Sequence, residues 1–269
     1  MFWVRLRSGI IMLAAAIVML VLGGPVMLAG TLAVSLVGMS ELYRILGFEK
    51  TPLAMLFYLA AGIYYVLIYL KQPQWLFPIL VMALIAGMCL FVIRYPAYDA
   101  PQLMMAFFGL VYVAVMISYM FQIRMQENGV FLVWLVFISS WGCDTCAYCA
   151  GMLFGKHKMA PVLSPKKSIE GAVGGVVGAA LIGVIYALIF RTHLTVFTNP
   201  VLALAVIGAL GGLISMVGDL TASAIKRHYG IKDYGTLIPG HGGILDRFDS
   251  VIITGPLVFY LIQLLRQFA

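Results

Sequence analysis

The sequence predicts an all-α, polytopic integral membrane protein with about nine transmembrane helices. Of its 269 residues, 63% are hydrophobic and only 10% are charged, and the mean hydropathy is +1.05. A soluble domain carries roughly 45–50% apolar and about 25% charged residues. So much apolar surface cannot be buried in one globular core, and lipid must therefore solvate much of it.

Short polar or Gly/Pro breaks divide the chain into nine apolar runs, and each run predicts one helix. The predicted spans are 9–22, 25–43, 52–70, 75–93, 102–121, 131–153, 171–190, 201–222 and 250–267. The first run is shorter than the roughly 20 residues that cross a bilayer. Gly23-Gly24-Pro25, which follows it, is compatible with a hairpin, a kink or a true turn. Because no long linker interrupts the chain, we expect a single integral membrane domain over residues 1–269.

The basic residues fall mostly in alternate loops, which predicts the orientation of the chain. If the N-terminus is cytoplasmic, most of the 17 Lys and Arg residues lie on the cytoplasmic side, as the positive-inside rule requires. The exceptions are Lys71, Arg124, Arg191 and Arg266. Topology thus explains the net charge of +7, and no basic and aromatic stripe indicates nucleic-acid binding. The long polar loops 154–170 and 223–249 are predicted to be cytoplasmic, in a bacterial inner (plasma) membrane.

Polar residues gather near the cytoplasmic end of the eighth predicted span. Ser215, Asp219, Ser223 and Lys226 are spaced four, four and three residues apart, so they share one helix face. A carboxylate in a membrane span is costly and normally pairs with a cation or faces a wet cavity. The alternative is a carboxylate that simply lies at the headgroup boundary.

A glycine-rich segment precedes the last predicted span. Gly240, Gly242 and Gly243 let backbone amides approach a phosphate chain closely. Asp246 and Asp249 follow three residues apart where the last helix begins. Such a pair suits Mg²⁺, which usually takes one or two carboxylates plus substrate phosphates. Acidic residues at a helix start also stabilise the helix dipole and cap free amides, so this second explanation stays open.

Two further groups of polar residues flank the loop 154–170. Asp144 precedes Lys156 by about 12 residues, which places it roughly 18 Å into a helix and makes it a functional candidate. Its alternative is a structural ion pair between helices. Lys166 and Lys167 come just before the seventh span, with Ser168 as the expected N-cap. These lysines would bind a triphosphate or an anionic lipid headgroup, or would act only as topology determinants.

The C-terminal part of the chain resembles a known family. Ser223–Arg227, Lys232-Asp233 and Ile238–Ser250 closely resemble the defining motif of the phosphatidate cytidylyltransferase (CDP-diacylglycerol synthase) family. Three upstream blocks look like other recurrent blocks of that family: Asp144–Tyr148, Phe154–Lys156 and Leu163–Gly171. The resemblance covers about residues 140–269, the expected catalytic half, whereas residues 1–130 match only as generic apolar helices. Cys146 and Ile169 depart from the family pattern, but neither change removes a candidate ligand.

The resemblance implies an enzyme that converts CTP and phosphatidate to CDP-diacylglycerol and pyrophosphate. It implies Mg²⁺ as cofactor, allows a second cation, and suggests a homodimer in the lipid bilayer. The metal ligands it implies are Asp144, Asp219, Asp246 and Asp249. The catalytic residues it implies are Lys226, Arg227, His241 and Asp246. The substrate-binding residues it implies are Lys166, Lys167, Ser223, Lys232, Gly240, Gly242, Gly243 and Arg247.

Other functions fit parts of the pattern. A cytidylyltransferase for another lipid phosphate, such as a polyprenyl or archaeal ether lipid, has no distinguishing motif, because apolar surfaces recognise the tail. A membrane transporter would place charges near the bilayer midplane and show repeated halves with broken helices. Here the polar residues cluster on one side. CDP-alcohol phosphotransferases use Asp-Gly…Ala-Arg…Gly…Asp…Asp on paired helices, and that ordered pattern is missing.

Overall fold

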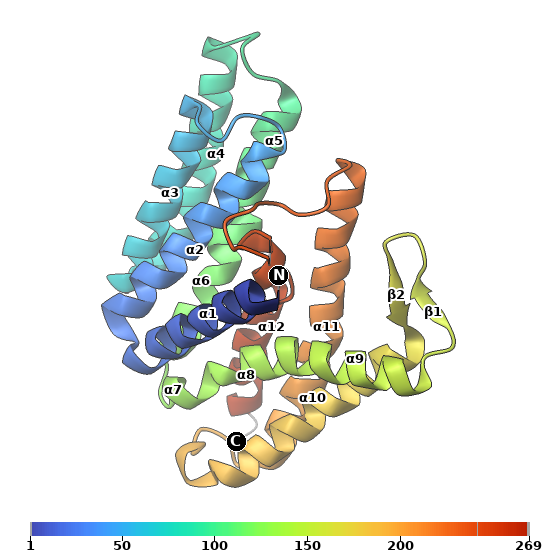
Figure 1. The fold of residues 1–269 in the computed structure, drawn as a ribbon. Coiled ribbons are helices and arrows are strands. Elements are labelled where there is room, and N and C mark those ends of the chain that lie inside the picture. Colours follow the sequence, from blue (N-terminus) through green and yellow to red (C-terminus); the bar gives the residue numbers. More distant parts are fainter. Residues whose placement is uncertain (1, 241, 268–269) are drawn as a thin grey trace. The chain divides into compact units, whose positions relative to one another are not determined.

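The computed structural model of the protein describes residues 2–240 and 242–267, and it is predominantly helical (Figure 1). The chain divides into two compact units. Unit 1 comprises Met1–Phe121 and Asp233–Arg247, and unit 2 comprises Gln122–Lys232 and Phe248–Ala269. Each unit is described by itself.

Eight helical segments in the described part of the chain are long and apolar enough to cross a membrane. The helices of unit 1 are α1 (Phe2–Leu22), α2 (Gly24–Arg44), α3 (Pro52–Tyr69), the 3-10 helix η1 (Pro73–Trp75), α4 (Leu76–Ile93), α5 (Ala100–Gly109), the π-helix η2 (Leu110–Val115) and the first part of α6 (Met116–Arg124). The apolar stretch of α1, Arg7–Leu22, is shorter than the eight. The prediction of an all-α polytopic membrane protein is confirmed. Eight of the nine predicted spans reach the length of a membrane span in the described residues, and the first predicted span is the shorter one.

The elements of unit 2 follow from residue 122 onwards. They are the end of α6, α7 (Gly129–Leu132), α8 (Trp134–Phe137), the π-helix η3 (Ile138–Gly142), α9 (Cys143–Phe154), β1 (Lys158–Ala160), β2 (Ser164–Ser168), α10 (Ile169–Ile189), the 3-10 helix η4 (Arg191–His193), α11 (Pro200–His228) and most of α12 (Leu245–Gln267).

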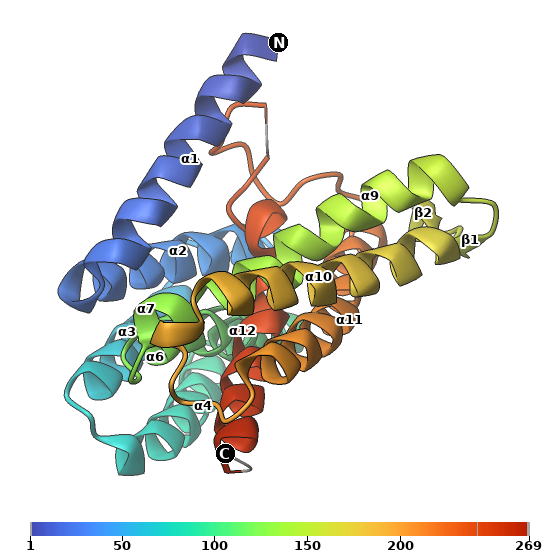
Figure 2. The same cartoon turned by 90° about the horizontal axis from the view of Figure 1, so that it is seen from below.

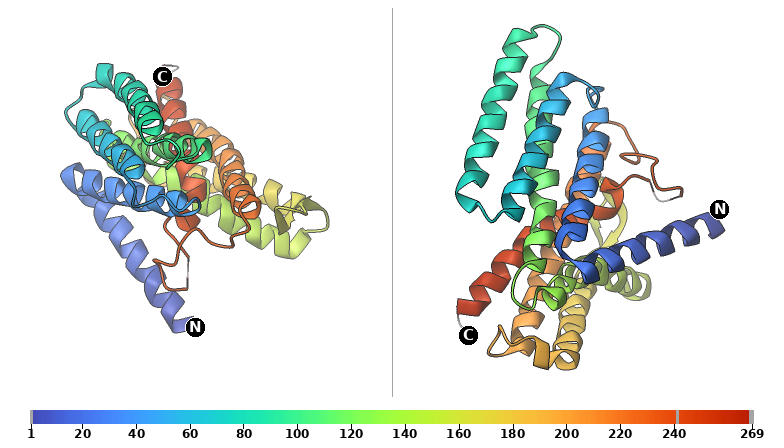
Figure 3. Two further views of the ribbon diagram at one scale, coloured as in Figure 1. Left: turned by 90° about the horizontal axis from the view of Figure 1, so that it is seen from above. Right: turned by 90° about the vertical axis from the view of Figure 1, so that its left-hand side faces the viewer.

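In unit 1, helices α2 to α5 pack as neighbouring rods around buried aromatic side chains (Figure 3). The hydroxyl of Tyr43 donates a 2.6 Å hydrogen bond to the carbonyl of Ala106 on α5. Tyr65 on α3 shares a 2.8 Å hydrogen bond with Ser35 on α2, and both residues are fully buried. In a membrane, the hydrophobic effect does not drive helices together, because lipid tails are as apolar as the side chains. Hydrogen bonds between helices therefore help to decide which helix faces pack.

The turn between α1 and α2 settles the question that Gly23-Gly24-Pro25 left open. Gly23 and Gly24 have φ values of 64° and 47°, a region that favours glycine. The two helices meet at this point and then diverge, so the segment forms a true turn (Figure 2).

In unit 2, helices α9, α10 and α11 lie side by side because small residues line their contacts (Figure 2). A Cβ atom on Gly183 would meet the carbonyl oxygen of Leu204 at 2.5 Å, and one on Gly208 would meet that of Ala179 at 2.5 Å. The backbones of α10 and α11 therefore approach too closely for any larger side chain, as in other membrane helix pairs built on small residues.

The loop predicted at 154–170 contains structure that an all-α description omits. Strands β1 and β2 form an antiparallel pair in which Lys158 faces Ser168. Ser168 also caps α10, as predicted, because its hydroxyl accepts a 3.1 Å hydrogen bond from the amide of Gly171. The carboxylate of Glu170 binds His157 Nδ1 at 2.6 Å, which holds the start of the hairpin against the first turn of α10.

Two helices extend further into the predicted 223–249 loop than the apolar pattern indicated. Helix α11 continues to His228, and α12 begins at Leu245 rather than at residue 250. Ser223, Lys226 and Arg227 thus lie on α11. A span predicted from hydropathy ends where polar residues begin. The helix itself continues past that point, because its backbone hydrogen bonds do not depend on apolar side chains.

Candidate active site

Asp144 lies directly after a π-helical segment in unit 2. Residues Ile138–Gly142 form the π-helix η3, and Asp144 is in the first turn of α9 that follows. Single π-helical turns inside α-helices are rare and occur frequently at functional sites. Ser250 on α12 is buried and lies close to the Asp144 carboxylate. Asp144 therefore has a polar neighbour on another helix.

Lys167 and Asp219 form an ion pair between β2 and α11. Their side chains are only 24% and 28% exposed. The Lys167 ammonium is buried, and within the described residues it has no hydrogen-bond acceptor of good geometry besides this ionic partner. Asp144 interacts electrostatically with both members of the pair. The sixth and eighth predicted spans and the predicted loop 154–170 thus contribute to the same cluster.

Asp249 completes the acidic side of this cluster. It interacts electrostatically with Asp219, Asp144 and Lys226, and its Oδ1 accepts a 2.8 Å hydrogen bond from the amide of Ser250. Unit 2 therefore brings together three of the four predicted metal ligands. Three ionised carboxylates in mutual range repel one another, and either protonation or a nearby cation relieves that repulsion.

A pocket of about 380 Å³ opens beside this cluster within unit 2. Its polar walls include Asp144, Lys166, Lys167 and Asp219. Its apolar walls come from α9, β1, α10 and α11 and include Ala147, Tyr148, Met152, Met159, Ala172 and Met216. The pocket is thus lined by both charged and apolar side chains.

The remaining predicted cationic and hydroxyl residues of unit 2 lie at the end of α11 and beyond it. Ser223 and Lys226 are half-buried, whereas Arg227 is exposed. Lys232 is exposed on the loop that follows. The structure brings Lys226 into electrostatic range of Asp249, and it gives no such contact for Lys232.

The donor set of unit 2 fits a hard divalent cation, although the carboxylates do not converge as a complete ligand cage. In the part of the chain that the structure describes, no group of three His, Cys, Asp or Glu side chains has metal-binding geometry. Mg²⁺ commonly takes only one or two carboxylates and completes its shell with water and substrate phosphates. Asp144, Asp219 and Asp249 supply the oxygen ligands that such an ion prefers.

Asp246, the fourth predicted metal ligand, belongs to unit 1 and organises the glycine-rich loop there. Its side chain is 7% exposed, and Oδ2 accepts 2.9 Å hydrogen bonds from the amides of Tyr234 and Gly243. Phosphate would therefore have to compete with Asp246 for the amide of Gly243. The role of Asp246 as a metal ligand stays a prediction.

The turn before Asp246 requires glycine. Gly240 and Gly242 have φ values of 79° and 86°, and Ile238 donates a 2.9 Å hydrogen bond to the carbonyl of Gly242. Arg247 is exposed. His241, a predicted catalytic residue, lies outside the described residues.

Sequence reasoning missed Glu41 on α2. This residue is 2% exposed, and its two carboxylate oxygens accept hydrogen bonds from the amides of Ile244 and Leu245 at 3.0 and 2.9 Å. A carboxylate inside a predicted membrane span is a functional candidate by default, and that signal was present in the sequence. Unit 1 thus holds the glycine-rich loop with two acidic side chains.

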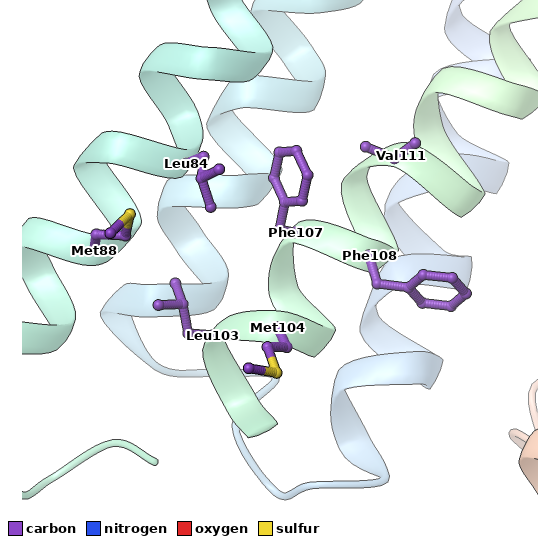
Figure 4. A pocket seen from close by; sticks show the side chains of 7 residues that line it. All are labelled: Leu84, Met88, Leu103, Met104, Phe107, Phe108 and Val111. Carbon is purple, nitrogen blue, oxygen red and sulfur yellow. The ribbon is translucent and has the colours of Figure 1, made fainter. Parts of the chain in front are cut away.

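A second pocket, of about 460 Å³, lies in unit 1 between α4, α5 and η2 (Figure 4). Its walls are entirely apolar and include Leu84, Phe107 and Val111. No side chain there can bind a phosphate or move a proton. The charged pocket of unit 2 is therefore the better candidate for chemistry.

The sequence matches a family of known proteins over nearly its whole length, and the match includes residues of both units. The sequence model of a family described as the cytidylyltransferase family matches residues 3–265. The chain is 33% identical over 266 residues to a phosphatidate cytidylyltransferase of Staphylococcus aureus (strain COL), which covers 96% of this chain and 98% of that protein. Proteins of the same name from Staphylococcus epidermidis (strain ATCC 35984) and Staphylococcus haemolyticus (strain JCSC1435) are 32% identical with the same coverage.

Proposed function

This chain belongs to the cytidylyltransferase family, and on that premise we propose that it transfers the cytidylyl group of CTP to phosphatidate, giving CDP-diacylglycerol and pyrophosphate. The observation that carries the proposal is the pocket of unit 2, which Lys167 and the carboxylates of Asp144 and Asp219 line together with apolar side chains. A substrate with a phosphate head and an apolar body matches such a surface.

The apolar residues of the pocket suit the lipid substrate. Tyr148 and Met152 on α9 line the pocket and are 67% and 64% exposed. In a membrane-spanning helix, exposed apolar side chains contact acyl chains. The diacylglycerol part of phosphatidate would remain in the bilayer along α9, and only the headgroup would enter the pocket.

The cationic residues of the pocket suit the phosphate groups. An ammonium carries three donors, and Lys167 has one ionic partner, so its remaining protons can bind phosphate oxygens. Lys166 lines the same pocket, and Lys226 lies within electrostatic range of Asp249. Arg227, Lys232 and the amides of Gly240 and Gly242 are further candidates for the triphosphate.

The reaction needs charge neutralisation more than proton transfer. An oxygen of the lipid phosphate, already anionic, attacks the α-phosphorus of CTP and forms a new P–O bond. The bond from that phosphorus to the bridging oxygen of pyrophosphate breaks, and pyrophosphate leaves with the electron pair. Lys167 and Lys226 would hold both anions in line and offset their repulsion. Asp144, Asp219 and Asp249 would hold Mg²⁺, which would neutralise phosphate charge when bound.

The setting of the reaction follows from the distribution of charge. The chain is a multi-pass membrane protein with bacterial relatives. Its Lys and Arg residues favour a cytoplasmic N-terminus and a site open to cytosolic CTP in the bacterial inner membrane. Assembly as a homodimer is supported only by the family resemblance.

Purified protein in lipid nanodiscs tests this function directly. Labelled CTP, Mg²⁺ and phosphatidate should yield pyrophosphate and a lipid-soluble cytidine product, and omission of phosphatidate should stop both. Replacing phosphatidate with a polyprenyl phosphate separates this substrate from another lipid phosphate. Turnover with the polyprenyl phosphate alone, or no pyrophosphate with either lipid, would reject the proposal.

A further inference from the structure

Glu41 is a buried acidic residue that the proposed reaction does not use. It lies near the end of α2, and its side chain is 2% exposed. Burial of a carboxylate is unfavourable unless hydrogen bonds compensate it. Glu41 obtains that compensation from the amides of Ile244 and Leu245, which donate to Oε1 and Oε2 respectively. These contacts lie within unit 1.

The glycine-rich loop is shaped to surround the Glu41 carboxylate. A Cβ atom on Gly235 would approach Glu41 Oε1 to 2.5 Å, and one on Gly243 would approach both oxygens to 2.5 Å. Neither glycine has a positive φ, so their small size is what the position requires. Two glycines of the loop are therefore explained by Glu41 rather than by a phosphate.

The Glu41 contacts come immediately before Asp246. Leu245 is the first residue of α12, and its amide is held by Glu41. Asp246 in turn binds the amides of Tyr234 and Gly243 from the same loop. A negative charge at a helix N-terminus is also stabilised by the helix dipole. Glu41 thus fixes the backbone from which Asp246 projects.

We propose that Glu41 is a positioning residue, which orients the Asp246 carboxylate and the glycine-rich loop for the reaction. The inference rests on the proposed function, since orientation matters only if Asp246 takes part. Residues that orient a ligand side chain through hydrogen bonds typically cost about 10- to 100-fold in metal affinity or activity when they are changed. A residue that only stabilises the fold would lower the melting temperature and leave the turnover of folded protein unchanged.

The experiment compares Glu41→Gln with Glu49→Gln. Glutamine keeps the shape of Glu41 but presents an NH₂ group to one of the two amide donors, so one hydrogen bond is lost. Glu49 is the matched control, because it pairs with Arg44 in unit 1, and its contacts in the described part of the chain include none with the loop. Hydrogen exchange of the amides at 242–245, without substrates, should be faster in Glu41→Gln than in the wild type and unchanged in Glu49→Gln.

Steady-state kinetics then separate positioning from stability. Below its melting temperature, Glu41→Gln should lose about 10- to 100-fold in kcat or in apparent Mg²⁺ affinity, with a smaller change in the KM for CTP. Glu49→Gln should match the wild type. Unchanged exchange at 242–245, or released amides with a wild-type kcat, would overturn the inference. If wild-type protein itself gives no product, the proposed function fails, and the inference fails with it because no reaction remains for Asp246.

Discussion

Lys167 and Asp219 form an ion pair that joins strand β2 to helix α11 within unit 2. The pair brings Lys167, a residue of the predicted loop, and Asp219, a carboxylate of a predicted span, together in the lining of the charged pocket. Both side chains are largely buried, as expected of charged groups that pair with one another inside a membrane protein.

Substitution of Lys167 should therefore impair catalysis strongly. Lys167→Met removes a phosphate donor from the pocket and leaves Asp219 without its ionic partner, so we expect kcat to fall by about 10²- to 10³-fold. Lys158→Met, at an exposed position of β1, should leave the rate within about twofold. Pyrophosphate release in nanodiscs measures both. Equal rates for the two variants would show that Lys167 does not bind substrate.

The Ser250 hydroxyl, which lies close to Asp144, should affect both stability and rate. Ser250→Ala removes a buried hydroxyl and should cost about 0.5–1.5 kcal/mol of stability. It also removes a polar neighbour of Asp144, so the rate should fall by about tenfold or more. Ser140→Ala is the control, because that buried hydroxyl donates a hydrogen bond to the carbonyl of Val136, four residues earlier in the chain.

Thermal unfolding and turnover of each folded serine variant separate these two effects. Ser140→Ala should lose stability and keep its rate. Loss of activity in Ser140→Ala to the same degree as in Ser250→Ala would mean that packing, rather than Asp144, explains the result.

The close approach of α10 and α11 predicts which glycines resist substitution. Gly208→Ala places a Cβ against the backbone oxygen of Ala179 and should destabilise the protein by about 1–3 kcal/mol. Gly62→Ala meets nothing within 4 Å in α3 and should leave stability unchanged or raise it slightly. Melting temperatures in one detergent provide the comparison. A Gly208→Ala protein as stable as the wild type would contradict the packing of these helices.

Removal of divalent cations should abolish turnover without unfolding the protein. Chelation would leave the carboxylates of unit 2 facing the phosphates directly, whereas the helices would persist because their backbone hydrogen bonds are internal. Added Mg²⁺ should restore the rate, and circular dichroism should remain unchanged throughout. Asp249→Asn should raise the Mg²⁺ concentration needed for half-maximal rate by about 10-fold or more.

Asp99→Asn is the matched control for the metal prediction. Asp99 caps α5 through the amide of Gln102, and asparagine caps a helix about as well. Its Mg²⁺ dependence should equal that of the wild type. Full activity in the presence of a chelator, or equal Mg²⁺ requirements for Asp249→Asn and Asp99→Asn, would refute a role for the cluster in cation binding.

Much of the fold could be predicted because its determinants are local. Long apolar runs gave the membrane helices, and a Ser before such a run gave the N-cap at Ser168. The spacing of Asp219, Ser223 and Lys226 placed them on one helix, and the structure confirms that α11 contains all three. Each of these inferences uses residues within a few turns of one another, where helix geometry fixes the relationship.

The contacts of the candidate site depend on helix packing and could not be predicted in this way. Ser250 reaches Asp144, and Glu41 reaches Leu245, across long stretches of sequence. No periodicity encodes such partners, because they follow from which helices pack together and in what register. The π-helical segments and the β1–β2 hairpin also escape a pattern based on hydropathy.

The sequence by itself determined the membrane-spanning class, the family and the residue types available for chemistry. Only the tertiary structure decided that Lys167 neutralises Asp219 and that Glu41 anchors the loop before Asp246. The physical reason is that each apolar residue contributes separately to the free energy of burial in lipid. Composition and the length of an apolar run are therefore enough to identify a membrane helix. A buried charge instead requires a partner, and tertiary packing, such as the close approach of Gly243 to the Glu41 carboxylate, decides which partner it has.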